Sequence, residues 1–141
     1  GAKRILGIAG KHADIVSINF NNSAGKIGPE GVGSGTSAGT LQKLEWIKAG
    51  AGDRFSEIEI EIAAYFTVIT EHSDVVANEF AKLFNLSSSE ILDHPHCLIG
   101  QTSEVIEKIQ QRREEFGINY ITFGGAAIDD VAPIVEALSG T

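Results

Sequence analysis

The chain has 141 residues, 43% hydrophobic and 21% charged, as in an ordinary globular protein, whereas a complete eight-stranded α/β barrel usually needs about 250 residues. Its 11 basic and 19 acidic residues give a net charge of −8, which argues against nucleic acid as a partner because phosphate neutralisation needs a basic surface. The single cysteine, Cys97, excludes an internal disulfide. The sequence has neither a long apolar run nor a signal-peptide pattern, which predicts a cytoplasmic protein outside the membrane.

The first third of the chain predicts a helix, a strand, a loop and a second helix. Residues 3–11 have the apolar spacing of a short amphipathic helix, and residues 15–20 read as a buried strand. Residues 21–39 are rich in Gly, Asn and Ser, which predicts a long loop. The next helix has Leu41, Leu44 and Ile47 along one side and ends near Gly50 and Asp53.

The middle of the chain predicts one long strand and two helices. Residues 58–70 begin with strict alternation of Ile and Glu and continue apolar, which predicts a single strand. Ser73 begins the following helix. Ser87 and Glu90 have the spacing of a capping box, which predicts a short helix ending near Asp93.

The last third predicts a helix, a strand and a closing helix. Thr102 is the predicted N-cap of a helix that Gly117 ends, and residues 118–123 form the predicted strand. The closing segment, residues 128–138, has helical apolar spacing, and we expect Pro133 to kink it or split it into two turns.

Strands that alternate with helices favour a parallel sheet and hence an α/β fold, in one domain over residues 1–141. Only three strands are predicted, so such a sheet would have two open edges and needs strands from elsewhere. The chain begins at Gly1 and contains no methionine, which we interpret as processing or as a piece of a longer chain. The fold prediction is the C-terminal half of a TIM (β/α)8 barrel.

Two glycine motifs are weak. Gly35 to Gly39 fits the G-x-S-x-G pattern of a hydrolase nucleophile elbow, but that elbow needs a strand directly before Ser37, and residues 31–34 do not predict one. We interpret Ser37 as the start of a helix and keep a hydrolase as a third hypothesis. A partial dinucleotide fingerprint at residues 33–38 comes too far after the first strand.

The titratable residues predict no metal site. His94, His96 and Cys97 stand too close together to share one tetrahedral ion, and Pro95 between the histidines favours a structural turn. We expect His12 and His72, at the ends of elements, to be solvated.

Glu59 and Glu61 allow two interpretations, since they could face solvent on an open sheet or the lumen of a barrel. We favour a position at the N-terminal end of their strand, away from any chemistry.

In an α/β barrel the active site lies at the C-terminal ends of the strands. The strand direction places nine residues there: Asn19, Phe20, Asn21, Thr67, Ile69, Thr70, Phe123, Gly124 and Gly125. Separately, Gly1, Ala2, Lys3 and Arg4 open the first helix. Its free N–H groups and positive dipole end suit a phosphate, although an ordinary helix start has the same pattern.

Four stretches of the chain form a recognisable set. They are GAKRILGIAGKHADIVSIN (1–19), LEWIKAGAGDRFSEIEIEI (44–62), PHCLIGQTSEVIEKIQQRREEFGINYITF (95–123) and IDDVAPIVEALSG (128–140). Together they resemble the luciferase-like monooxygenase family, and within it the branch that uses the deazaflavin coenzyme F420. The first is similar to that family's glycine-basic helix and strand, and the second to its Gly-Asp-Arg-Phe turn and penultimate strand. The third is similar to its Ile-Gly-Thr turn, helix and final strand, and the fourth to its terminal Ala-Pro helix.

The resemblance implies a flavin- or deazaflavin-dependent oxidoreductase that transfers a hydride between the reduced cofactor, F420 or alternatively FMN, and a small organic substrate. It implies a cofactor-phosphate site at Gly1, Ala2, Lys3 and Arg4, to which we add Asn19 after the first strand. No catalytic residue carries over, because the family's ring and substrate contacts come largely from the other half of its barrel. The alternative is a free-standing half-barrel binding module without catalysis. As partners we expect either a second copy, in a homo-oligomer, or the missing N-terminal half.

Overall fold

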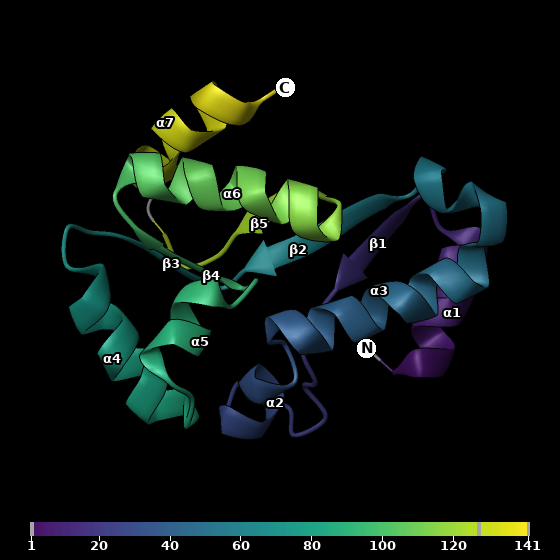
Figure 1. Ribbon diagram of the computed structural model, residues 1–141, viewed down its shortest axis with the longest axis horizontal. Coiled ribbons are helices and arrows are strands. Elements are labelled where there is room, and N and C mark those ends of the chain that lie inside the picture. The colour runs from purple at the N-terminus through teal and green to yellow at the C-terminus, as the bar shows by residue number, and fades with distance from the viewer. Residues whose placement is uncertain (1, 127, 141) are drawn as a thin grey trace.

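The computed structural model describes residues 2–126 and 128–140 as a mixed α/β fold in which parallel strands alternate with helices (Figure 1). The elements of the first half are α1 (Lys3–His12), β1 (Ile15–Ile18), α2 (Pro29–Gly33), α3 (Ser37–Ala51), the 3₁₀ helix η1 (Gly52–Glu57), β2 (Glu59–Ala64) and β3 (Phe66–Ile69). Those of the second half are α4 (Ser73–Phe84), α5 (Ser88–Asp93), β4 (Cys97–Gly100), α6 (Thr102–Phe116), β5 (Ile118–Phe123) and α7 (Ile128–Leu138).

All the strand pairs are parallel, as the alternation of elements predicts. β2 lies between β1 and β5 in one sheet, and β3 pairs with β4 in a second. The β2–β5 register shifts at Ile60, whose N–H donates to the side-chain Oδ1 of Asn119 at 2.9 Å. A side chain thus takes a place in the ladder that a carbonyl would otherwise fill.

The predicted single strand over residues 58–70 is wrong, because Tyr65 divides it into β2 and β3. The two pieces serve different sheets: β2 pairs with β1 and β5, while β3 pairs with β4. The strand β4 was not predicted. The sequence pattern predicts a structural turn at His94 to Cys97 and assigns no element to the apolar residues that follow. α2 and η1 also occupy segments that were predicted to be loop or turn.

The helix ends and the proline prediction need smaller corrections. The N-cap of α6 is Gln101, which forms a capping box with Glu104, and Thr102 is the first helical residue. Pro133 does not split the closing segment, because a single helix runs from Ile128 to Leu138. The capping box of Ser87 and Glu90 at the start of α5 is confirmed.

Three clusters of buried side chains form the core. The first joins α1 and α3 to the sheet through residues such as Leu6, Ile47 and Ile62. The second lies under α4 and α5, and the third under α6 and α7.

The helices α1 and α3 pack so closely that glycine is required where they touch. A Cβ atom on Gly10 would overlap the carbonyl oxygen of Ile47, and one on Gly50 would overlap that of Gly7. This close packing holds the middle and the C-terminal part of α1 against α3.

Among residues 2–126 and 128–140, no strand pairs with the outer edge of β1 or of β5, so the expected open sheet edges are present. In the same residues no helix combines the length and the apolar character that crossing a bilayer requires.

Candidate functional site

A cavity of about 570 Å³ lies where β1 ends. The chain leaves β1 at Ile18, forms part of the cavity wall, and returns through α2 into α3, which forms another part. The start of α1 contributes as well. The lining residues are Ala2, Asn19, Phe20, Asn21, Asn22, Ser34, Gly39, Gln42, Lys43 and Trp46, none of which is acidic.

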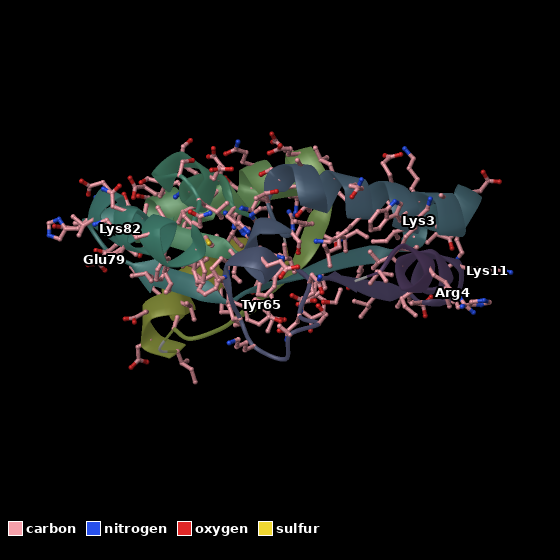
Figure 2. All side chains as sticks on the ribbon, turned by 90° about the horizontal axis from the view of Figure 1, so that it is seen from below. Lys3, Arg4, Lys11, Tyr65, Glu79 and Lys82 are labelled. Carbon is pink, nitrogen blue, oxygen red and sulfur yellow. The ribbon has the colours of Figure 1, made fainter. Side chains whose placement is uncertain are left out.

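The cavity brings together two of the residues predicted to bind a cofactor. Ala2 and Asn19 both line it, although they belong to different segments. Lys3 and Arg4 are exposed and do not line it, and Figure 2 shows both at the α1 end of the molecule. Gly1 lies outside the described residues.

Lys43 is the cationic side chain of this cavity, and it was not predicted from the sequence. The residue is only 5% exposed, and its Nζ donates to the carbonyl oxygen of Ser34 at 2.7 Å. Burial lowers the pKa of the ammonium group. Within the described part of the chain, the ion pair formed is that of Arg54 with Asp14, so Lys43 has no carboxylate partner there.

Asn19 is held in place by the segment that divides β2 from β3. Its Nδ2 donates to the hydroxyl oxygen of Tyr65 at 2.7 Å, and its Oδ1 accepts from the backbone N–H of Phe20 at 2.8 Å. The rings of Phe20, Tyr65 and His96 pack together, with centroids 5.0–5.9 Å apart. Tyr65, which separates β2 from β3, therefore positions the side chain of Asn19 at the C-terminal end of β1.

His96 belongs to this ring cluster and His94 packs against it, with ring centroids 5.5 Å apart. Both histidines flank Pro95 in a structural turn, as the sequence predicts. Nδ1 of His96 lies 2.8 Å from the carbonyl oxygen of Ala63, and because a carbonyl only accepts, this nitrogen carries the proton. By the same argument, Nε2 of His94 donates to the carbonyl oxygen of Val32 at 2.9 Å. Burial lowers both pKa values, that of His96 to about 3.

Arg112 fixes the same turn from α6. Its guanidinium donates to the carbonyl oxygens of Pro95, His94 and Cys97 at 3.0, 2.9 and 2.6 Å. The guanidinium donors of Arg112 thus hold the turn in place. Separately, no group of three His, Cys, Asp or Glu side chains within residues 2–126 and 128–140 is arranged to hold a metal ion.

The remaining candidates lie apart from the cavity. Ser37 begins α3 and donates to the carbonyl oxygen of Asp93 at 3.1 Å, and the element before it is the helix α2, so the nucleophile elbow is absent. Thr67 is buried and bonds to the carbonyl oxygen of Ala64. Ile69 and Thr70 line a different cavity, beside α6.

The C-terminal end of β5 also lies outside the cavity lining. It packs against Tyr65, the residue that separates β2 from β3. The N–H of Gly124 donates to the carbonyl oxygen of Ala64 at 3.0 Å. A Cβ on Gly124 would lie 3.3 Å from the Cα of Tyr65.

The predictions for two histidines and two glutamates are met only in part. His12 and His72 are exposed, as expected. Glu59 and Glu61 lie in the N-terminal half of β2, as expected, but Glu61 is buried at 9% exposure.

Comparison with known proteins adds little to this geometry. No protein-family model and no curated protein matches the sequence. A solved structure, the monooxygenase RslO1 from Streptomyces bottropensis, aligns with a TM-score of 0.48 at 12% sequence identity. The alignment covers 96% of this chain and 43% of that one, so the chain spans less than half of the monooxygenase.

Proposed function

We propose that the chain is the cofactor-phosphate-binding part of a flavin- or deazaflavin-dependent oxidoreductase, equivalent to the C-terminal half of a luciferase-like (β/α)8 barrel. The observation that carries this proposal is that Ala2 and Asn19 line one cavity together with the buried cation Lys43. The preferred cofactor is coenzyme F420, with FMN as the alternative, because the sequence pattern resembles the F420 branch.

The residues around the cavity suit a phosphate group. The first turn of α1 has free N–H groups, no side-chain cap and no acidic residue, which leaves its positive dipole end available. Lys43 adds a full charge, and Asn21, Asn22 and Gln42 add amide donors. A phosphate at this position would give the ammonium group of Lys43 the anionic partner that it lacks within the described residues.

The cofactor supplies the chemistry when bound, by transferring a hydride to or from a small organic substrate. This chain's own residues anchor and orient the cofactor. Contacts to the reacting ring and to the substrate would come from strands that pair with the open edges of β1 and β5.

Trp46 provides a direct test, because it lines the cavity and is the single tryptophan of the chain. Titration with F420 or FMN should quench its fluorescence in a saturable manner. Riboflavin and the deazaflavin without its phosphate tail are the matched ligands, and we expect both to bind at least about tenfold more weakly. Equal affinity with and without the phosphate would contradict the proposed site.

Lys43→Gln should weaken binding of the phosphorylated cofactors by about ten- to a hundredfold, which is the usual contribution of a hydrogen bond to a charged group. Affinity for riboflavin should change little. The matched control is Lys48→Gln, since Lys48 is exposed on the same helix and does not line the cavity. If both variants bind FMN and F420 like the original chain, Lys43 does not hold the phosphate.

A free-standing half barrel that binds a ligand without catalysis is the second candidate, and the open sheet edges favour it. Neither candidate expects turnover by the purified chain alone, so the two differ in the state of the particle that binds the cofactor. Size-exclusion chromatography with light scattering should show a compact, soluble two-chain particle for the binding module, whereas a heterogeneous aggregate would favour a piece of a larger enzyme.

A further inference from the structure

The two open edges of the three-stranded sheet are bordered by helices that expose apolar side chains. α1 lies beside β1 and packs on α3, while α7 packs on α6 near β5 (Figure 1). The two helices lie on opposite sides of the molecule, so they do not cover each other within one chain.

The exposed face of α1 is apolar and basic. Ile5 and Ile8 are 61% and 49% exposed. Arg4 and Lys11 stand one turn on either side of Ile8 and share its face. The helix contains no acidic residue, and Ile15, on the neighbouring edge strand, is also half exposed.

The exposed face of α7 is apolar and acidic. Ile128 and Val135 are 82% and 45% exposed, and Asp129 and Glu136 lie beside them, in a helix without a basic residue. Val135 also lines a groove of about 320 Å³ along the edge of β5, together with Tyr120 and Phe123.

We propose that the α1–β1 edge of one chain docks against the α7–β5 edge of a second copy. All strands run in the same direction, so a two-fold axis parallel to them brings β1 of each copy beside β5 of the other. Both open edges of both copies are then covered in one closed dimer. The isoleucines of α1 meet the groove beside α7, and Arg4 and Lys11 meet Asp129 and Glu136.

A second copy is the occupant that the charges favour. The protein as a whole is acidic, with a net charge of −8, so two copies repel each other at long range. A basic helix on one edge and an acidic helix on the other reverse this repulsion locally. This inference goes beyond the cofactor site and is tested without any cofactor.

The test uses two double charge reversals, Arg4→Glu with Lys11→Glu, and Asp129→Lys with Glu136→Lys. Sedimentation velocity should show a dimer for the original chain, and each double variant alone should dissociate at least about tenfold more readily. An equimolar mixture of the two should form dimers again, because acidic α1 then meets basic α7 and acidic α7 meets basic α1. The second variant is informative by itself, since its net charge moves toward zero while its self-association is expected to fall.

The control is Glu79→Lys with Lys82→Glu. These two residues are exposed on α4, at the end of the molecule opposite α1 in Figure 2, and exchanging them leaves the net charge unchanged. This variant should remain a dimer. A monomeric original chain over the whole micromolar range, or double variants that dissociate alone and do not recombine, would overturn the proposal. The first result would assign the open edges to strands of another polypeptide segment.

Carbodiimide cross-linking gives a second measurement that does not depend on how the variants fold. In an equimolar mixture of ¹⁵N-labelled and unlabelled chain, Lys11 should link to Glu136 in mixed-isotope pairs. If the chain dimerises but these links join other residues, a different surface forms the interface.

Discussion

At the scale of single residues, buried side chains around the cavity fix the site and also make the fold sensitive to acid. His96 is fully buried, its Nδ1–H donates to Ala63, and its Nε2 has no partner within the described residues. A protonated imidazole would therefore place a charge where no acceptor stabilises it.

The pKa of His96 predicts the direction of this effect. In the folded chain it is lowered to about 3, whereas an unfolded histidine titrates near 6.5. The unfolded chain therefore binds the proton more readily, and the stability from neutral His96 is complete above pH 6.5 and is lost as the pH falls toward 3. The free energy of unfolding should fall by up to about 1.4 kcal/mol per pH unit in this window. His94 shifts in the same direction.

Urea unfolding at about pH 7.5 and at about pH 5, on either side of the unfolded pKa, measures the difference. His96→Phe should reduce the pH dependence, because the phenyl ring keeps the ring packing with Phe20 and Tyr65 and does not titrate. His12→Gln, at the exposed end of α1, should keep the full dependence. An unchanged slope in His96→Phe would show that other groups cause the acid sensitivity.

At the scale of elements, the α1–α3 contact is where glycine matters. Gly10→Ala places a methyl group on the backbone of Ile47, so the helices must separate. We expect the unfolding free energy to fall by roughly 1–3 kcal/mol, as for an overpacked core. Gly7→Ala is the matched control, because its nearest atom lies 3.8 Å away and alanine favours a helix by about 0.5–1 kcal/mol.

Thermal unfolding followed by circular dichroism separates the two variants. Gly7→Ala should match or exceed the melting temperature of the original chain, and Gly10→Ala should melt several degrees lower. If both alanines are tolerated equally, α1 does not pack on α3 as closely as described. Because Ala2, the N-cap of α1, lines the cofactor cavity, Gly10→Ala should weaken cofactor binding as well.

How much could be predicted from the sequence depends on whether the signal is local. The capping box of Ser87 and Glu90, the amphipathic α1 and the strand β5 are written in short, contiguous patterns, and all three are present. β4 is only four residues long, and its pairing with β3 is a tertiary contact that no short pattern contains. The break at Tyr65 depends equally on partners in two different sheets.

The candidate site follows the same rule. The strand direction placed Asn19 at the end of β1, and it does line the cavity there. Lys43 was missed although it occupies the same helical face as Thr40, Leu44 and Ile47, which are all buried. A lysine at a position with apolar spacing was the available signal, because burying an ammonium group is costly unless it is paired or hydrogen-bonded.

At the scale of the whole molecule, the open edges of the three-stranded sheet are the feature that a complete protein or assembly has to cover. A three-stranded parallel sheet exposes unpaired backbone groups on β1 and β5, and parallel sheets are normally covered and extended. Both the barrel interpretation and the proposed dimer require another set of strands on these edges. They differ in whether that set belongs to a second copy of this chain.

Hydrogen exchange at two protein concentrations separates a covered edge from an open one. β2 is bonded on both sides, so its amides should exchange slowly at every concentration. The amides of β1 and β5 that point away from β2 should be protected at high concentration, where the dimer forms, and should exchange much faster on dilution. The charge-reversal variant of α7 should show the fast pattern at both concentrations, whereas the α4 control should behave like the original chain. Outward amides that stay protected in the diluted monomer would mean that the chain covers its own edges, and neither added strands nor a second copy would then be needed.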